Sequence, residues 1–181
     1  MQVVPIHSLA VFCGSKNGKT PLYIEHAVQL GKILTGHNVT LIYGGGSVGI
    51  MGTIADTVMN HGGKAIGVIP QVLVDWERQH NSLSELLVVD NMHSRKKTMY
   101  ELCDAAIILP GGFGTLDELF EMVTWNQLSI HDKQIYILNS GRYYKHLIAH
   151  IQQMQEENFL YETAQQRLTI INEPAELIQY L

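Results

Sequence analysis

Three glycine-rich segments carry the residues best suited to chemistry, and the segment at 110–118 is the most informative. It reads Pro-Gly-Gly-Phe-Gly-Thr-Leu-Asp-Glu and directly follows the apolar run Ala105 to Leu109. Apolar residues then recur at helical spacing, so a helix with an apolar stripe is expected here, at Leu116, Leu119, Phe120 and Val123. A helix start binds anions through its free N–H groups and positive dipole, and glycines let a phosphate approach the backbone. The segment predicts a phosphate-binding turn, to which the hydroxyl of Thr115 can add a hydrogen bond.

Asp117 and Glu118 end this segment, and spacing alone leaves two interpretations of them open. We expect both in the first turn of the helix, where carboxylates are common because they stabilise the helix dipole. A carboxylate beside a phosphate site can also act in acid–base chemistry or stabilise a developing positive charge. Glu121, one turn further on, could orient a partner or face solvent.

The segment at 44–49 reads Gly-Gly-Gly-Ser-Val-Gly and has the G-x-G-x-x-G spacing of a dinucleotide-binding loop. Such a loop is normally followed by an acidic residue at the end of the next strand, which holds a ribose hydroxyl. Here that strand ends Val-Ile-Pro-Gln at residues 68–71 and offers no carboxylate. NAD binding is therefore weakly supported, and a tight turn that brings the backbone close to another ligand is preferred.

The segment at 14–20 resembles the P-loop of ATP-binding proteins but lacks its spacing. A P-loop has four residues between its two key glycines, whereas three separate Gly14 from Gly18. An ATP-dependent phosphoryl-transfer enzyme is therefore disfavoured. The segment is either a plain connection to the next helix or a loop whose Ser15 donates a hydrogen bond to a ligand.

The elements that must position these loops alternate between short apolar runs and segments of helical length. The runs are continuous, which is typical of parallel strands covered on both faces. They are Ser8–Cys13, Thr40–Tyr43, Lys64–Ile69, Leu86–Val89, Ala105–Leu109 and Gln134–Leu138, with a last short element at Leu168–Ile171. The helical segments are Leu22–Leu34, Met51–Asn60, Arg95–Leu102, Leu116–Leu128, Tyr144–Asn158 and Pro174–Leu181.

This alternation predicts an α/β fold, a doubly wound, Rossmann-like parallel sheet with helices on both faces. Residues 1–181 contain no linker or repeat and are expected to form a single nucleotide-binding domain. In such a sheet ligands bind outside the carboxyl ends of the strands, where all three glycine-rich segments lie. The loop Gln71 to Glu85 is expected to cover that site with Asp75, Trp76, Glu77, Arg78 and His80.

Composition disfavours several classes of function. The formal net charge of −5 gives no general attraction for nucleic acid or anionic membranes, so neither is expected as a partner. No apolar run approaches the length of a membrane span, and Met1 to His7 does not resemble a secretory signal. Cys13 and Cys103 have no metal-type spacing and are expected to be reduced and buried. These features favour a cytoplasmic protein.

Neither a metal nor a cofactor is expected. His146 and His150 are four residues apart on one predicted helix, but no third ligand is near in sequence, so we interpret them as surface residues. Nothing in the sequence resembles a pyridoxal phosphate site, with its Schiff-base lysine and its partner for the pyridinium nitrogen.

Taken together, the segments resemble the LOG family of cytokinin riboside 5′-monophosphate phosphoribohydrolases, many of which were once labelled possible lysine decarboxylases. Residues 110–118 match the PGGxGTxxE motif of that family. Asp117 stands where many members have Glu, and Asn91 interrupts the commoner Asp-Met-His. Further similarity follows in order at Cys13–Ser15, Tyr43–Gly52, Val68–Pro70, Val89–Lys96 and Thr124–Leu128, so it covers nearly the whole chain.

The resemblance implies cleavage of the N-glycosidic bond of a purine nucleoside 5′-monophosphate, either AMP or a cytokinin nucleotide, to free base and ribose 5-phosphate. It places Arg95 and Glu118 on the two catalytic positions of the family. Breaking this bond builds positive charge on the ribose, which a carboxylate can stabilise while it orients the attacking water. We assign that role to Glu118. Arg95 keeps its proton and is expected to clamp ribose or phosphate; without the resemblance, a solvated helix face would be the preferred interpretation of Arg95.

The glycine-rich loops and the family motifs together predict which residues contact the substrate. These are Ser15, Gly45, Gly46, Met92, Lys96, Gly111, Gly112, Gly114, Thr115 and Glu121. His93 is either a proton donor to the leaving base or part of a helix cap.

The resemblance also suggests a homodimer with residues from both subunits near each site. The apolar surface of Leu116–Leu128, which includes Trp125, exceeds what a single stripe needs and agrees with that expectation. The alternative function is a non-catalytic carrier or sensor that binds a nucleotide or a nucleotide-like cofactor on the same fold. The intact Arg95 and Glu118 favour catalysis.

Overall fold

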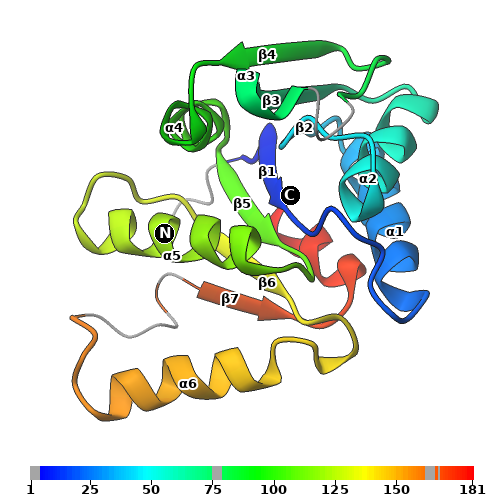
Figure 1. Ribbon diagram of the computed structural model, residues 1–181. Helices are drawn as coiled ribbons and strands as arrows, with labels where there is room; N and C mark the ends of the chain where they lie inside the picture. Colours follow the sequence, from blue (N-terminus) through cyan, green and yellow to red (C-terminus); the bar gives the residue numbers. More distant parts are fainter. Residues whose placement is uncertain (1–4, 75–78, 162–165, 167) are drawn as a thin grey trace.

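The computed structural model describes residues 5–74, 79–161, 166 and 168–181 (Figure 1). At its centre is a seven-stranded sheet in which neighbouring strands run parallel, in the order β4-β3-β2-β1-β5-β6-β7. The strands are β1 (Ser8–Phe12), β2 (Thr40–Tyr43), β3 (Ala65–Pro70), β4 (Glu85–Val89), β5 (Ala105–Ile108), β6 (Ile135–Leu138) and β7 (Leu168–Ile171).

Helices cover both faces of the sheet, as Figure 1 shows. On one face lie α1 (Leu22–Gly36), α2 (Gly49–Asn60) and the C-terminal 3-10 helix η2 (Pro174–Tyr180). On the other face lie α4 (Met92–Leu102), α5 (Phe113–Gln127) and α6 (Lys145–Glu156). Two short elements follow strands: α3 (Gln71–Val74) after β3, and the 3-10 helix η1 (Ser140–Arg142) after β6.

The apolar character of the strands accounts for two cores, one on each face. Every residue of β5 and β6 is buried, whereas the edge strand β4 has only half-buried and exposed residues. Side chains of a strand alternate between faces. Leu9 and Val11 of β1 therefore pack on the side of α1 and α2, while Ala10 and Phe12 pack on the side of α4 and α5. The predicted doubly wound sheet with both faces covered is confirmed.

The order of the strands indicates where on the sheet a ligand would bind. The chain winds outward from β1 to β4 and then returns to place β5 on the other side of β1. β1 and β5 thus form the topological switch point, and sheets of this kind bind ligands in the crevice outside the carboxyl ends there. Phe12 pairs with Ile108, so the loops after both strands leave the sheet side by side. The N–H of Gly14 donates to the carbonyl of Pro110 at 3.0 Å, which joins them.

The start of α5 differs from the prediction in a way that affects the site. The helix begins at Phe113 instead of Leu116, because Gly112 serves as its N-cap. Asp117 and Glu118 therefore lie in the second turn, and the prediction that they occupy the first turn is wrong. Their position cannot be explained by stabilisation of the helix dipole, an effect that falls off within the first turn.

The buried face of α5 differs as well. Leu119 is buried, but Phe120, expected beside it in the apolar stripe, is 39% exposed. Thr115 and Glu118 take buried positions instead. Two polar side chains turned inward are unusual for a helix that packs on a core, and they point to a site between the helix and the sheet.

α4 begins at Met92, three residues earlier than predicted. The side chain of Asn91 caps it by accepting a hydrogen bond from the N–H of Ser94 at 2.9 Å. His93 is exposed, and the cap belongs to Asn91. The residue that interrupts the common family pattern therefore fixes where this helix starts.

Two further predictions concern the loop between β3 and β4 and the C-terminal helix. The loop between β3 and β4 contains α3, but residues 75–78 lie outside the described residues, and with them the predicted covering roles of Asp75, Trp76, Glu77 and Arg78. The predicted C-terminal helix is a 3-10 helix that starts at Pro174. None of the helices described is both long and apolar enough to cross a membrane.

Candidate active site

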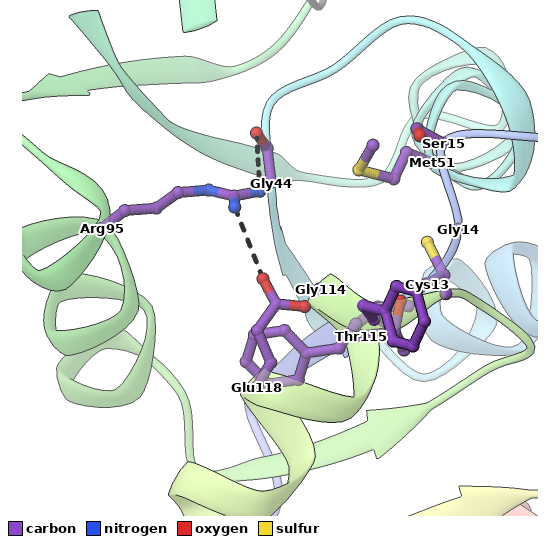
Figure 2. A pocket seen from close by; sticks show the side chains of 13 residues that line it. Cys13, Gly14, Ser15, Gly44, Met51, Arg95, Gly114, Thr115 and Glu118 are labelled. Atoms are coloured by element: carbon purple, nitrogen blue, oxygen red, sulfur yellow. Dashed lines mark hydrogen bonds and ion pairs between the residues drawn. The ribbon is translucent and has the colours of Figure 1, made fainter. Parts of the chain in front are cut away.

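A cavity of about 250 Å³ opens at the carboxyl ends of β1, β2 and β5. All three glycine-rich segments reach it. The loop after β1 contributes Gly14 and Ser15, the loop after β2 contributes Gly44, and the start of α5 contributes Gly112, Gly114 and Thr115. Figure 2 shows Arg95 and Glu118 side by side in this cavity, with Met51 and Ser15 across from them.

Arg95 reaches the cavity from α4 and is only 6% exposed. Its Nε donates to the carbonyl of Val68 in β3 at 3.0 Å, and its Nη2 donates to the carbonyl of Gly44 at 3.3 Å. Its Nη1 lies 3.4 Å from Oε1 of Glu118 on α5 (Figure 2). A buried charge needs such partners, so the interpretation of Arg95 as part of a solvated helix face is wrong. Two of its five N–H donors are not taken by these described partners and can serve a ligand.

Gly44 has to be a glycine for this arrangement to exist. A Cβ on Gly44 would collide with Nη2 of Arg95. Gly45 and Gly46, predicted to contact the substrate, lie outside the lining and hold the loop that precedes β4. The carbonyl of Gly45 accepts from the N–H of His80 at 3.1 Å, and Gly46 forms a β-bridge with Gln79.

Cys13 lines the cavity, although its sequence position favours only a core role. Burial raises the pKa of its thiol, the charge of Glu118 raises it further, and the charge of Arg95 opposes the increase. The thiol therefore stays protonated, so it is not suited to act as a nucleophile. Cys13 and Cys103 are both buried and form no disulfide, which confirms that neither is paired.

The start of α5 supplies several hydrogen-bond donors at one place. With Gly112 as the N-cap, the N–H groups of Phe113, Gly114 and Thr115 have no acceptor inside the helix. A Cβ on Gly112 or Gly114 would meet nothing within 4 Å, so open space lies in front of these donors. Such a turn suits a phosphate group. A Cβ on Gly111 would collide with the hydroxyl of Thr115, so Gly111 shapes the turn by close packing.

Lys96 and Glu121, both predicted to contact the substrate, lie outside the lining and bind each other. Nζ of Lys96 contacts the carboxylate of Glu121 and donates to Oδ2 of Asp117 at 3.0 Å. Burial tends to lower the pKa of Lys96, but the hydrogen bonds to Glu121 and Asp117 outweigh it, and the pKa is raised. This permanently charged ammonium joins α4 to α5 beside the pair of Arg95 and Glu118.

Several lining residues were missed by sequence reasoning. Met51 of α2 lines the cavity, whereas Met92, the predicted contact residue, is 40% exposed and lies outside it. Phe113 lines it as well and is 94% exposed. Gly44 lies in the glycine-rich loop after β2, and Met51 lies in the first turn of the helix that follows it. Their nearness to the carboxyl end of a strand was the sequence signal that could have identified them.

A metal site finds no support within the described ranges. No three side chains of His, Cys, Asp or Glu among them approach closely enough to hold an ion. His146 and His150 are both exposed on α6, as their interpretation as surface residues predicts.

Comparison with known proteins gives a consistent answer. Residues 51–181 match the family described as "Possible lysine decarboxylase". The chain is 44% identical over 173 residues to the probable cytokinin riboside 5′-monophosphate phosphoribohydrolase LOGL2 of Oryza sativa subsp. japonica, a match that covers 96% of this chain and 71% of that one. It is 41% identical over 181 residues to the cytokinin riboside 5′-monophosphate phosphoribohydrolase LOG3 of Arabidopsis thaliana, covering 100% of this chain and 84% of that one.

A solved structure shares the fold at much lower identity. The Moco carrier protein of Chlamydomonas reinhardtii superposes with a TM-score of 0.70 over 95% of this chain and 93% of its own, at 17% identity. That likeness concerns the fold alone. The match to the plant proteins extends over nearly the full chain, and residues 51–181 match the family model, so this chain belongs to the LOG family, the group described as possible lysine decarboxylases.

Proposed function

We propose that this protein hydrolyses the N-glycosidic bond of a purine nucleoside 5′-monophosphate and releases the free base and ribose 5-phosphate. The observation that carries the proposal is the buried pair of Arg95 and Glu118, which faces a cavity whose other wall is an anion-binding helix start. The names of the plant relatives describe the same reaction class.

The 5′-phosphate is placed at the start of α5. There it meets the N–H groups of Gly114 and Thr115, the hydroxyl of Thr115, and Ser15 from the loop after β1. The ribose then lies toward Glu118, since both ends of the cavity belong to one continuous lining. In this placement the start of α5 holds the substrate by its phosphate, and the carboxylate of Glu118 acts at C1′ of the ribose.

Hydrolysis breaks the bond between C1′ and N9 and adds one water. The base leaves with the electron pair of that bond and gains a proton, and C1′ gains the hydroxyl. Glu118 stabilises the positive charge that develops on the ribose and accepts a proton from the attacking water. Arg95 remains charged throughout. It holds the carboxylate of Glu118 in place and offers its remaining N–H donors to the substrate.

The other predicted contact residues receive supporting roles in the proposal. Lys96 and Glu121 hold α4 against α5, and Gly45 and Gly46 hold the loop before β4. Met92 is exposed at the start of α4, and its proposed role is to contact either the base of the substrate or a second subunit.

The description of the family as possible lysine decarboxylases does not fit the chemistry of this cavity. A pyridoxal phosphate decarboxylase needs a lysine that forms a Schiff base. No lysine is among the residues that line the cavity in the described part of the chain, and Lys96 is engaged by two carboxylates.

A homodimer through the exposed face of α5 is part of the proposal. Phe113 and Phe120 are 94% and 39% exposed, and they share one helix face with the half-buried Leu116 and Val123. This apolar stripe adjoins the cavity, so a second copy seated on it would complete the mouth of the site. Trp125, expected to contribute to that surface, packs instead against Tyr100 at 4.7 Å between ring centroids.

Three broader features complete the proposal. Residues 1–181 are taken to act as one nucleotide-binding domain, and the acidic chain is taken to bind no nucleic acid. A cytoplasmic location is proposed because both cysteines are buried and unpaired, as is usual in a reducing compartment. Cell fractionation that recovers the protein in an oxidising compartment would contradict the last point.

The test is incubation of the purified protein, without added metal, with AMP and with isopentenyladenosine 5′-monophosphate, followed by chromatography of the released bases. We expect free base from at least one substrate, and the ratio gives the preferred one. Glu118→Gln should bind substrate but turn over at least ~100-fold more slowly, because acid–base assistance is lost. Glu101→Gln, an exposed substitution of the same type on α4, is the matched control and should keep full activity.

Two outcomes would change the conclusion. If AMP binds but no base is released, the carrier or sensor function replaces the hydrolase. If base is released at the same rate by Glu118→Gln, the reaction stands but Glu118 has no part in it.

A further inference from the structure

Three consecutive carbonyl groups of the phosphate turn are each held by a donor. The carbonyl of Leu109 accepts from the hydroxyl of Tyr144 at 2.6 Å, and that of Gly111 accepts from the hydroxyl of Tyr143 at 2.6 Å. The carbonyl of Pro110, between them, accepts from the N–H of Gly14 at 3.0 Å. Two of the three donors are tyrosines from a segment that no motif of the sequence singled out.

The bond from Tyr143 fixes the direction of one peptide plane. In a trans peptide the C=O and the following N–H point in opposite directions. Since the carbonyl of Gly111 is directed at Tyr143, the N–H of Gly112 points away from it. Tyr143 and Gly111 line a second cavity of about 390 Å³, whereas Arg95 and Glu118 line only the first. Gly112 lines both cavities, and an N–H directed away from Tyr143 is available to a phosphate in the first.

The same bond removes an unfavourable group from that side. A carbonyl oxygen carries partial negative charge and repels phosphate, so a turn whose carbonyls can rotate forward binds an anion poorly. The hydroxyl of Tyr143 holds the carbonyl oxygen of Gly111, and that of Tyr144 holds the carbonyl oxygen of Leu109, so neither oxygen is free to rotate toward a bound phosphate. Burial raises the pKa of Tyr144, so its hydroxyl stays protonated and remains a donor.

Both tyrosine rings are themselves fixed. Tyr144 is buried, and its N–H donates to Oδ1 of Asn139 at 2.8 Å. The ring of Tyr143 packs edge-on against Tyr144 and Tyr23, with centroids 4.8 and 5.6 Å away. The hydroxyl of Tyr143 is therefore presented to the turn by a rigid aromatic cluster, although this side chain is 44% exposed.

We propose that Tyr143 is a positioning residue for phosphate recognition. It does not touch the substrate; it orients the peptide between Gly111 and Gly112 so that the N–H of Gly112 donates to the phosphate monoester. Tyr144 holds the carbonyl of Leu109 from inside the core, but the next residue is Pro110, which has no N–H to offer a ligand. The inference rests on the proposed function only in taking that phosphate to be the one shared by the nucleotide and the ribose 5-phosphate product.

The experiment is the variant Tyr143→Phe, which removes the hydroxyl and keeps the ring. We expect KM for AMP and the inhibition constant of ribose 5-phosphate to rise together by about fivefold, the effect of losing one neutral hydrogen bond. We expect kcat to stay within about twofold, because the groups at C1′ are unchanged. Inhibition by adenosine, which lacks the phosphate, should not change.

Tyr23→Phe is the matched control, because it alters the ring partner of Tyr143 while leaving the bond to Gly111 in place. It should behave as the wild type in every assay. Melting temperature and far-UV circular dichroism of both variants establish that they are folded.

The inference is overturned if folded Tyr143→Phe binds ribose 5-phosphate as the wild type does. It is also overturned if adenosine and ribose 5-phosphate weaken equally, since that would be general loosening of the site. Direct binding of ribose 5-phosphate, measured by calorimetry, separates this inference from the proposed function. A wild-type protein that binds it but releases no base refutes the hydrolase and still tests Tyr143.

Discussion

At the scale of single residues, the candidate site is built around the guanidinium of Arg95, whose remaining donors are proposed to serve a ligand. Three N–H groups of Arg95 donate to the carbonyls of Val68 and Gly44 and to the carboxylate of Glu118. A lysine could not replace Arg95, because a single ammonium lacks the planar fork that reaches two backbone carbonyls and a carboxylate at once. The same fixed fork explains why Gly44 has no side chain.

Gly112→Val tests the phosphate turn at this scale. The new side chain would meet no protein atom within 4 Å at its Cβ, so we expect a folded protein with a normal melting temperature. The side chain would instead occupy the space in front of the N–H donors, and the affinity for ribose 5-phosphate should fall by about tenfold or more. Isothermal titration calorimetry measures it.

Gly36→Val is the matched control, since a Cβ there also meets nothing within 4 Å and the site is remote, at the end of α1. It should bind ribose 5-phosphate normally. Normal binding by folded Gly112→Val would remove this turn from phosphate recognition.

At the scale of elements, α4 and α5 are joined beside the site by side chains. Lys96 of α4 bonds to Asp117 and Glu121, which flank Glu118 on α5. Tyr100 of α4 adds a hydrogen bond from its hydroxyl to the carbonyl of Glu118 at 3.3 Å. One ammonium thus neutralises two carboxylates that would otherwise act on the charge of the third.

Lys96→Met should move the acidic limb of the pH profile of kcat/KM to higher pH. Without the ammonium, the charges of Asp117 and Glu121 disfavour the ionised form of Glu118, and a more alkaline solution is needed to ionise it. Arg95, Tyr100 and Cys13 also lie near Glu118, and the substitution leaves them unchanged. Initial rates measured across the pH range give both limbs.

Two further variants make this test specific. Lys97→Met removes an exposed neighbouring lysine, paired with Glu101, and should leave the profile alone. Adding Glu121→Gln to Lys96→Met should move the limb back toward the wild-type position. A profile that Lys96→Met does not alter would argue that Lys96 has only a structural role.

Asp104 links the two strands of the switch point. Its Oδ2 accepts from the N–H groups of His7 and Ser8, each at 2.8 Å, and from the hydroxyl of Ser8 at 3.0 Å. Burial tends to raise the pKa of Asp104, but these hydrogen bonds outweigh it, and the pKa is lowered. The start of β5 is thereby held to the start of β1.

Asp104→Asn should destabilise the protein in a way that depends on pH. A lowered folded-state pKa stabilises the fold above the unfolded value, about 3.9, and this contribution is lost as pH falls through the lower folded-state pKa. We expect a loss of about 1 kcal/mol at pH 7, kept small by the exposure of the carboxylate. Chemical denaturation at pH 7 and near pH 3 measures the difference, which should shrink at the lower pH. An equal loss at both values would contradict the assigned role.

At the scale of the whole molecule, the apolar face of α5 is the surface through which the proposed homodimer would form. Phe113 and Phe120 leave apolar surface beside the cavity, and Leu128 and Ile130, just beyond the helix, are 64% and 61% exposed. Exposed apolar side chains gathered in one region favour an interaction site. A specific interface buries about 800 Å² on each partner.

Phe120→Lys should convert the proposed dimer to a monomer at micromolar concentration, because a buried unpaired charge at an interface is costly. Sedimentation velocity measures the mass. Ile178→Lys, on η2 at the opposite face and 45% exposed, is the matched control and should leave the mass unchanged. A wild-type protein that sediments as a monomer would refute the dimer.

The sequence alone determined the architecture and indicated the edge of the sheet where the candidate site lies. Continuous apolar runs alternating with helical segments require a parallel sheet covered on both faces, and chain order then sends the three glycine-rich loops to the same edge. These are local or topological properties, so they follow from periodicity. The motif at 110–118 also indicated an anion-binding helix start, although the position of its N-cap, Gly112, shifted the helix by three residues.

Only the tertiary structure decided which side chains meet. Arg95 and Glu118 belong to different helices, and Lys96 pairs with carboxylates more than twenty residues away. Tyr143 bonds to a turn 32 residues earlier. Such contacts depend on the rotation of each helix about its axis and on long-range packing, for which the sequence has no periodic signal. The physical reason is that spacing fixes which face of an element a residue occupies, whereas the partner across that face is set only when the elements pack.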